Sequence, residues 1–335
     1  MMRVAVFNGA GNPITIEDVE DAPLGPGDVR IEIGRCGICG SDISLTSGSP
    51  FDYATGSRMG HESAGTVIEV GSGVTSLKVG DRVSVLPRGF CGKCANCRAG
   101  RPLFCETGPN CVGGFGERLV ITESSGFRFP DSVSMAEGAL VEPVACGRRA
   151  FRMSRLEKGA SVLVMGAGSM GLAAVYWARQ MGAGRIVVLT RTAARHEIAL
   201  AMGADAAVSV SEDDPEALGR VLSGPPDFVV EATGKLGMLQ SAVDKVRLGG
   251  SVVSLGMCVQ PDPVVPALNG FREISMFFPL GYSAEDFDET IRAFDAGTIR
   301  PETMVTETMA LDRLPALVEE MRGPHHHLKV QIIPG

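Results

Sequence analysis

Short stretches in which apolar and polar residues alternate characterise the first 143 residues. Residues 29–33, Val-Arg-Ile-Glu-Ile, alternate strictly, as a half-buried strand does. Residues 65–71 and 82–85 are two more short apolar stretches bounded by turn residues. The pattern predicts a mostly β domain over residues 1–143.

Between residue 144 and about residue 282 the pattern changes to alternating strands and helices. Apolar runs typical of buried strands occupy residues 161–165, 185–189, 228–231 and 251–255. Strands that alternate with helical stretches indicate an α/β domain with a parallel, doubly wound sheet.

The last segment, residues 283–335, is too short to form a core of its own. Helical patterns occupy residues 286–296 and 313–322, and a closing strand is expected at residues 329–333. We expect this segment to fold back onto the N-terminal domain.

The length and charge of the chain favour a two-domain protein and argue against a nucleic-acid partner. A chain of 335 residues favours two domains. Its net charge of −8 argues against a nucleic-acid partner, which usually requires a basic face. No apolar run approaches the roughly 20 residues of a membrane span, and the first residues contain no apolar run long enough for a signal peptide. We therefore expect a cytoplasmic protein without a membrane partner.

Four of the nine cysteines lie in one short lobe, residues 91–105, with the spacing C-x2-C-x2-C-x7-C. They are Cys91, Cys94, Cys97 and Cys105. Four thiolates this close can surround one zinc ion and leave no position for a substrate. The alternatives are buried apolar thiols or disulfides, and a reducing compartment disfavours the latter. We predict a structural zinc site.

A different donor set lies upstream, at Cys39 and in the triplet Gly60-His61-Glu62. Sulfur, nitrogen and oxygen donors that leave a coordination position open are typical of a catalytic metal. The sequence thus predicts two zinc ions per subunit with different roles.

A glycine-rich turn follows the strand expected at residues 161–165 and precedes an apolar helix that extends to Met181. In this context the G-x-G-x-x-G pattern indicates dinucleotide binding, because the backbone can approach a pyrophosphate at a helix N-terminus. The expected contacts are Gly166, Gly168, Ser169, Met170 and Gly171.

The end of the next strand, about 20 residues further on, usually distinguishes NAD from NADP. Thr190 stands there in place of a carboxylate, followed by Arg191 and Arg195. Two guanidinium groups can bind a 2′-phosphate that no carboxylate repels, so NADP is favoured over NAD. The alternative is that both arginines are solvated surface charges.

Together these motifs resemble the zinc-containing medium-chain alcohol dehydrogenase family over nearly the whole chain. The resemblance is carried by residues 36–42, 60–65, 80–83, the cysteine lobe, Glu142-Pro143, the glycine turn and residues 231–234. It implies an α/β protein with a GroES-like catalytic domain over 1–143, a Rossmann domain over 144–282, and a C-terminal segment over 283–335 that completes the catalytic domain.

The resemblance also implies roles for single residues. Cys39 and His61 match ligands of the catalytic zinc. Glu62 matches a residue that ligates zinc or moves in and out of its shell, and Glu142 matches a further carboxylate near the metal.

Ser41 matches the hydroxyl that begins the proton relay, and Asp42 is expected to orient His61. Further cofactor contacts are implied after two later strands, at Ala232, Thr233, Leu255 and Gly256. The implied reaction transfers a hydride between NADP and a secondary alcohol, such as a polyol or diol, and interconverts alcohol and ketone.

Two departures from the family pattern bear on the substrate. Ser44 replaces a histidine that many relatives use to pass the proton to solvent, and Gly281 replaces an arginine that contacts substrate hydroxyls in sorbitol-type members. Both weaken the sorbitol interpretation and leave a diol, an aminocyclitol or a less polar secondary alcohol as possible substrates. An NAD-linked sorbitol- or threonine-type dehydrogenase remains the alternative, and a non-enzymatic zinc-ribbon interaction protein is a remote one.

Two other segments allow predictions about surface exposure and oligomeric state. His325-His326-His327 follows a Gly-Pro turn signal and is expected to be an exposed loop, since adjacent histidines do not converge on one ion. The apolar stretch at residues 275–279 is costly to leave in water and, with the family resemblance, favours a homotetramer or homodimer.

Overall fold

A computed structural model of the chain describes residues 1–48, 52–210 and 217–335. Contacts between residues divide the chain into two compact units. Unit 1 contains residues 1–142, 282–296 and 305–335. Unit 2 contains residues 143–281 and 297–304.

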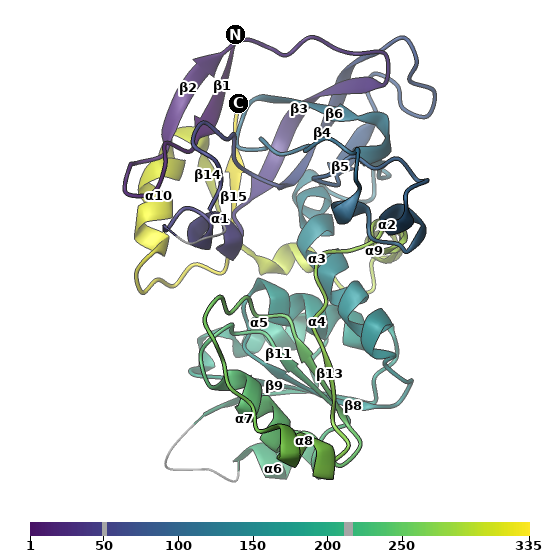
Figure 1. The fold of residues 1–335 in the computed structure, drawn as a ribbon, viewed down its shortest axis with the longest axis vertical. Coiled ribbons are helices and arrows are strands. Elements are labelled where there is room, and N and C mark those ends of the chain that lie inside the picture. Colours follow the sequence, from purple (N-terminus) through teal and green to yellow (C-terminus); the bar gives the residue numbers. More distant parts are fainter. Residues whose placement is uncertain (49–51, 211–216) are drawn as a thin grey trace. The chain divides into compact units, whose positions relative to one another are not determined.

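Unit 1 is built on a mostly antiparallel sheet that has seven strands within the described residues (Figure 1). The order is β14-β15-β3-β4-β5-β7, with β6 paired to β3. Their bounds are β3 Asp28–Gly37, β4 Glu62–Val70, β5 Arg82–Val85, β6 Arg118–Thr122, β7 Gly126–Arg128, β14 Val305–Ala310 and β15 Lys329–Ile333. A separate antiparallel pair joins β1 Met2–Val6 and β2 Thr15–Val19.

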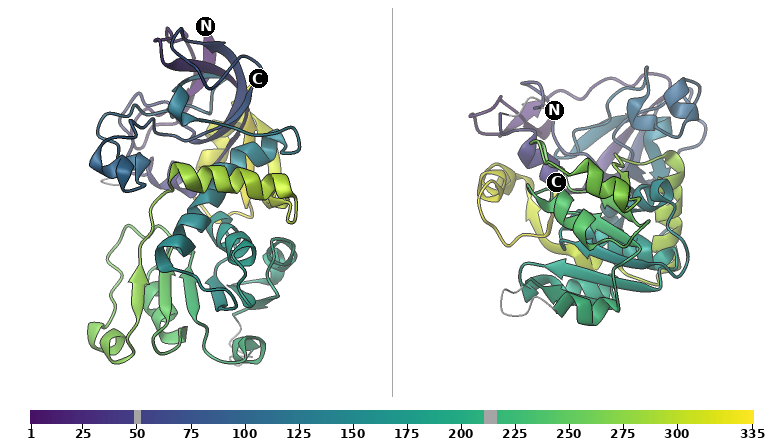
Figure 2. Two further views of the ribbon diagram at one scale, coloured as in Figure 1. Left: turned by 90° about the vertical axis from the view of Figure 1, so that its right-hand side faces the viewer. Right: turned by 60° about the horizontal axis from the view of Figure 1, so that its bottom comes forward.

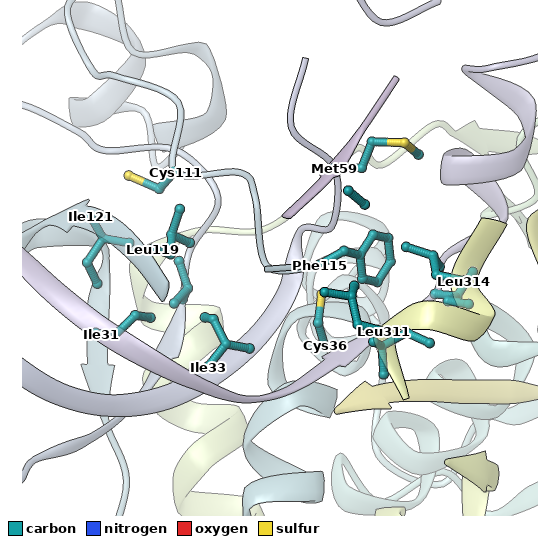
Figure 3. Close-up of a cluster of buried hydrophobic side chains, with 14 of the residues drawn as sticks. Ile31, Ile33, Cys36, Met59, Cys111, Phe115, Leu119, Ile121, Leu311 and Leu314 are labelled. Carbon is teal, nitrogen blue, oxygen red and sulfur yellow. The ribbon is translucent and has the colours of Figure 1, made fainter. Parts of the chain in front are cut away.

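The core of unit 1 lies against the alternating residues of β3. Ile31 and Ile33 are buried, and Phe115, Leu119 and Leu314 belong to the same apolar cluster (Figure 3). The predicted strand at residues 29–33 is the first half of β3, which continues to Gly37. Antiparallel pairing then places Gly37 opposite Glu62 at the start of β4. This pairing brings the Cys39 turn beside His61.

The C-terminal segment joins the same sheet. β15 pairs antiparallel with β3, where Gln331 lies opposite Gly37, and parallel with β14. The two helices of the segment are α9 Ala284–Ala296 and α10 Leu314–Met321, close to the predicted bounds. The left view of Figure 2 shows the full length of α9.

Unit 2 holds a parallel sheet of six strands, counted over its described residues, in the order β10-β9-β8-β11-β12-β13. The strands are β8 Ser161–Met165, β9 Arg185–Thr190, β10 Ala206–Ser209, β11 Phe228–Glu231, β12 Ser251–Ser254 and β13 Ser275–Phe277. Its helices include α4 Ser169–Gln180, α5 His196–Ala201, α6 Ala217–Leu222, α7 Met238–Lys245 and α8 Pro266–Phe271. Figure 1 shows α4 and α5 on one face and α7 and α8 on the other. The predicted doubly wound α/β class is confirmed.

The carboxyl ends of four central strands of unit 2 lie side by side. The register pairs Met165 of β8 with Leu189 of β9 and with Glu231 of β11, and Glu231 with Ser254 of β12. The strand order reverses between β8 and β11, which is where such sheets bind ligands.

The first part of the chain also carries helices. They are α1 Gly40–Ser44, α2 Ala95–Arg98, the 3-10 turn Pro102–Phe104 and the long α3 Met135–Ser154, whose residues belong partly to each unit. Among the described helices, none combines the length and apolar character needed to cross a bilayer.

Candidate active site and metal centres

The turn between β3 and α1 is held by its own Asp42. The Asp42 Oδ2 atom accepts a hydrogen bond from the Cys39 backbone N–H at 3.0 Å, and the Asp42 N–H donates to the Cys39 carbonyl at 3.0 Å. These reciprocal bonds fix the direction of the Cys39 side chain. Asp42 is fully buried, so the turn cannot change shape without exposing a carboxylate.

His61 lies between Asp42 and Ser41. Its Nδ1 atom is 3.4 Å from Asp42 Oδ1, and its Nε2 atom is 3.4 Å from the Ser41 hydroxyl oxygen. Burial alone would lower the pKa of His61, but the Asp42 carboxylate and the Cys39 sulfur raise it well above its usual value. A carboxylate beside Nδ1 orients the ring and leaves Nε2, which lies beside the Ser41 hydroxyl, as the nitrogen available to a metal.

The donor atoms of Cys39, His61 and Glu62 all lie within 4.8 Å of one another. Sulfur, imidazole nitrogen and carboxylate oxygen are three ligands that zinc accepts, and three protein ligands leave a fourth position open. The predicted residues therefore converge and fit a zinc ion by chemistry and spacing.

Glu62 has a partner that the sequence motifs did not reveal. The Lys329 ammonium group contacts both carboxylate oxygens, at 2.7 and 2.6 Å, and donates to the Ile38 carbonyl at 2.9 Å. Both side chains are buried. The available signal was a lysine at the start of a mostly apolar closing strand, Lys-Val-Gln-Ile-Ile, because a lysine is rarely buried unless its charge is paired.

Glu142, in α3, lies apart from the three close donors but shares their electrostatic environment. Its Oε1 atom accepts a hydrogen bond from the Tyr282 hydroxyl at 2.7 Å. Burial raises the pKa of Glu142 to about 7, with Glu62 acting in the same direction and His61 and Tyr282 opposing it. The carboxyl group can therefore hold or release a proton near neutral pH.

The four cysteines of the 91–105 lobe face one another. The sulfur atoms of Cys91 and Cys97 are 3.9 Å apart, and all four sulfurs lie within 4.8 Å of one another. All are free thiols, so the disulfide alternative is not what the structure has. A zinc ion with bonds of about 2.3 Å in tetrahedral geometry separates its sulfur ligands by about 3.8 Å.

Backbone amides support the sulfur atoms of this lobe. The Cys94 N–H lies 3.4 Å from Cys91 Sγ, the Cys97 N–H 3.4 Å from Cys94 Sγ, and the Cys91 N–H 3.3 Å from Cys105 Sγ. The amides of Lys93 and Cys94 lower the pKa of Cys91. Donors aimed at sulfur favour the thiolate form, which is the form that binds zinc.

The glycine turn of unit 2 lies between β8 and α4 as the motif predicts. Gly166 has φ of 103°, which favours glycine, and a Cβ atom on Gly171 would lie 2.0 Å from the Gly166 carbonyl oxygen. The turn therefore requires glycine at both positions. Gly168, Ser169 and Met170 place backbone N–H groups at the start of α4, where a phosphate is stabilised.

The two arginines beyond β9 differ in their surroundings. Arg191 is exposed, whereas Arg195 is half-buried and its Nη1 atom donates to the Ala167 carbonyl of the glycine turn at 3.3 Å. Thr190, at the end of β9, has its hydroxyl 2.8 Å from the Thr192 carbonyl and 3.0 Å from His196 Nε2. His196 was not predicted as part of this site, and only its position next to Arg195 could have indicated it.

The ends of β11 and β12 contribute the remaining predicted positions. The Glu231 carboxylate accepts the Thr233 N–H at 2.6 Å and the Gly234 N–H at 3.1 Å, which shapes the turn containing Ala232. The Leu255 and Gly256 amides both donate to the Glu231 carbonyl. A Cβ atom on Gly166 would lie 2.9 Å from the Thr233 methyl group, so this turn lies against the glycine turn.

The prediction that the histidine triplet is an exposed loop is wrong for His327. The His327 side chain is 3% exposed, and its two ring nitrogens lie 2.5 Å from Glu307 Oε1 and 3.0 Å from Glu320 Oε1. The sequence could not show this, because the two carboxylates come from β14 and α10. His325 and His326 are exposed.

Two family profiles match this chain, one mostly in unit 1 and one mostly in unit 2. Residues 25–131 match the family profile of the alcohol dehydrogenase GroES-like domain, and residues 169–296 match that of zinc-binding dehydrogenases. The chain belongs to the zinc-containing alcohol dehydrogenase family. It is therefore an oxidoreductase, and the family that its motifs predicted is confirmed.

Several known proteins are similar to this chain over its full length. Sorbitol dehydrogenase of Bacillus subtilis is 31% identical over 346 residues, covering 100% of this chain and 98% of its own. A zinc-binding dehydrogenase of Sinorhizobium meliloti bound to NADP has a TM-score of 0.88 at 28% identity and covers 100% and 99% of the two chains. The 2R,3R-butanediol dehydrogenase of Bacillus subtilis has a TM-score of 0.86 at 28% identity and covers both chains fully.

Proposed function

We propose that this dehydrogenase oxidises a secondary hydroxyl group of a diol or polyol to the corresponding ketone, and catalyses the reverse reaction, with NADP as the hydride carrier. The observation that carries the proposal is the convergence of Cys39, His61 and Glu62, with the Ser41 hydroxyl beside the histidine. Full-length similarity to sorbitol and butanediol dehydrogenases supports the substrate class.

Two zinc ions per subunit are part of the proposal. Cys39, His61 and Glu62 would hold one ion, with Glu142 as a further carboxylate nearby, and Cys91, Cys94, Cys97 and Cys105 would hold the other. The first ion would supply Lewis-acid polarisation of the substrate oxygen, and the second would stabilise the fold. Metal analysis of the purified protein should give two zinc ions per chain.

The residues around the first site divide the remaining work. Asp42 orients His61, and Lys329 holds the Glu62 carboxylate in place. The Ser41 hydroxyl, beside His61, would accept the proton from a substrate hydroxyl. Ser44, which stands where many relatives have a relay histidine, has its hydroxyl 3.4 Å from the Ser41 carbonyl. The proton must therefore leave Ser41 by a shorter path or through water.

The preference for NADP rests on the ends of β8 and β9. No carboxylate stands at Thr190, and the Arg195 guanidinium lies against the glycine turn, where it can reach a 2′-phosphate. The similar Sinorhizobium meliloti enzyme is bound to NADP, whereas a similar Escherichia coli alcohol dehydrogenase is complexed with NADH, so these two structures favour opposite cofactors. An NAD-linked enzyme of the sorbitol or threonine type is the alternative.

Initial rates with a panel of secondary alcohols, diols, polyols and amino alcohols test the substrate class directly. Each compound is assayed with NAD and with NADP by the absorbance of the reduced nicotinamide. We expect the highest kcat/KM for a vicinal diol or polyol with NADP. Sorbitol itself should be a poorer substrate, because Gly281 lacks the guanidinium that contacts its hydroxyls in sorbitol-type relatives. A preference for simple monohydric alcohols or amino alcohols would contradict the proposed substrate.

A further inference from the structure

A second group of possible metal donors lies at the C-terminal edge of unit 1, away from the donors already described. Glu307 is in β14, Glu320 is in the last turn of α10, and His326 and His327 belong to the loop that leads into β15. We call these four residues the β14–β15 cluster. Its members come from three consecutive segments of the chain and meet because β14 and β15 pair in parallel.

His327 is the buried centre of this cluster. Its Nδ1 atom lies 2.5 Å from Glu307 Oε1, and its Nε2 atom lies 3.0 Å from Glu320 Oε1. A neutral imidazole has a single N–H group, so it can donate to only one of two carboxylates. The second nitrogen then faces the second carboxylate with a lone pair, unless a proton or a metal ion lies between them.

His326 supplies a third donor on the open side. Its Nε2 atom is 3.9 Å from the same Glu307 oxygen, and its side chain is 84% exposed. The donors of Glu307, His326 and His327 lie within 4.8 Å of one another. Zinc bonds of about 2.0–2.2 Å in tetrahedral geometry require donor separations of about 3.3–3.6 Å. To bind the ion, His327 Nδ1 and Glu307 Oε1, now 2.5 Å apart, would have to separate by about 0.8–1.1 Å, and the exposed His326 side chain, now 3.9 Å from the same oxygen, would have to move inward.

We propose that the β14–β15 cluster binds a divalent transition metal ion through Glu307, His326 and His327, with Glu320 orienting the His327 ring. The carboxylate of Glu320 takes the Nε2–H group and leaves Nδ1 for the metal, the arrangement common to histidine ligands. Two imidazoles and a carboxylate suit Zn²⁺ or Ni²⁺, and water completes the coordination shell.

The ion would fasten the loop before β15 to β14 and α10. Lys329 is two residues beyond His327 on β15 and contacts Glu62, so the loop also precedes the residue that orients a candidate catalytic ligand. The site is independent of the proposed reaction and takes no part in hydride transfer.

Equilibrium dialysis of the full-length enzyme against buffered free Zn²⁺, followed by elemental analysis, tests the proposal. We expect a third equivalent of zinc beyond the two proposed above, and a rise in Tm as it binds. His326→Ala should weaken the third equivalent by at least about tenfold and abolish the rise in Tm. His326 is exposed, so this variant should fold normally, and its alcohol dehydrogenase activity should match that of the wild type.

His325→Ala is the matched control, because His325 is an exposed neighbour outside the donor group, although its ring stacks on that of His327 with 5.7 Å between the centroids. It should keep the third equivalent. If the wild type takes up no third zinc, His327 is a protonated bridge between two glutamates and the proposal is wrong. If His325→Ala weakens binding as much as His326→Ala, the histidine run binds zinc adventitiously and the proposal is equally wrong.

Discussion

At the scale of single residues, the buried Lys329 ammonium determines how the Glu62 carboxylate is presented to Cys39 and His61. A buried ion pair contributes little net stability when complete, but the loss of one partner leaves an uncompensated charge in the interior. Lys329 and Glu62 are 267 residues apart in the sequence. Neither local pattern nor spacing could predict the pair, although the Glu62 motif itself was recognisable.

We predict that Lys329→Met destabilises the zinc-free enzyme by about 3–5 kcal/mol, because Glu62 loses its only described cationic partner in that form. Zinc at the Cys39 site would compensate the Glu62 charge, so the loss should be smaller in the zinc-loaded enzyme. Urea denaturation with and without a chelator measures both values. The double variant Glu62→Gln/Lys329→Met is the control and should recover most of the stability. Equal stability of Lys329→Met and wild type would show that the pair is dispensable.

The cofactor preference is also decided by single residues. The wild type should prefer NADP over NAD by at least about tenfold in kcat/KM, since a charge-assisted bond to the 2′-phosphate contributes about 1.5–3 kcal/mol. Arg195→Ala should remove more of this preference than Arg191→Ala, because Arg195 lies against the glycine turn and Arg191 is exposed. Thr190→Asp should shift the preference toward NAD by repelling the phosphate. A wild type that uses NAD better, or an unchanged ratio in both arginine variants, would overturn the NADP assignment.

At the scale of elements, strand ends in unit 2 are joined by Asp227, which immediately precedes β11. Its Oδ2 atom accepts the Ser161 N–H and hydroxyl, both at 2.7 Å, and its Oδ1 atom accepts Arg247 Nε at 2.6 Å. Burial alone would raise the pKa of Asp227, but these partners lower it below its usual 3.8. The carboxylate thus connects β8, β11 and the segment before β12.

This shift gives a stability prediction with a definite pH dependence. A carboxyl group whose pKa is lowered in the folded state stabilises it above the unfolded-state pKa, and that contribution is lost as pH falls through the folded-state pKa. Asp227→Asn should therefore destabilise the enzyme near pH 7 by about 1–3 kcal/mol. Its difference from wild type in urea midpoint should shrink below about pH 4. A pH-independent difference would point to packing instead of charge.

Elements differed in how far the sequence revealed them. The buried strands β8, β9, β11 and β12 were predicted within a residue, because short continuous apolar runs bounded by turn residues are typical of strands buried on both faces. β14 was missed. In its sequence, Val-Thr-Glu-Thr-Met-Ala, Glu307 lies on the more buried face of the strand. Apolar and polar residues therefore do not alternate along β14 in the way that predicts a half-buried strand. The reason for an inward carboxylate, His327, lies in another element.

At the scale of the whole molecule, the six-stranded sheet of unit 2 ends at β13, an apolar edge strand. Beside it Phe271, Phe278 and Leu280 are 83%, 62% and 59% exposed. Apolar side chains gathered at an unpaired sheet edge favour association with a second copy of the chain. The expectation of a homotetramer or homodimer was based partly on the same stretch, residues 275–279.

Light scattering at micromolar concentration should give a mass of two or four subunits. Phe278→Lys should shift the mass toward a monomer, because it introduces a charge into the proposed contact. Leu200→Lys is the matched control, since Leu200 is an exposed leucine on α5, next to the opposite edge strand β10. A monomeric wild type, or an equal effect of both variants, would refute association through this edge.

The family, the fold class and the candidate donor residues could all be inferred from the sequence, because glycine turns and metal-ligand spacings are local. The contacts that the sequence could not predict depend on long-range packing. Lys329 behind Glu62, Tyr282 on Glu142 and the carboxylates around His327 are contacts between segments that only the folded sheet brings together.

The most direct test of the central claim is the activity of Cys39→Ser with the preferred alcohol, measured beside its NADP binding. Cys39 is a proposed ligand of the substrate-polarising zinc and lies in unit 1, whereas the glycine turn lies in unit 2. We expect Cys39→Ser to lose turnover while NADP binding, the circular dichroism spectrum and the second zinc are retained. Chelation should inactivate the wild type, and added zinc should restore its activity. Full activity of Cys39→Ser, or of a wild type shown to lack metal at this site, would contradict the zinc-dependent mechanism.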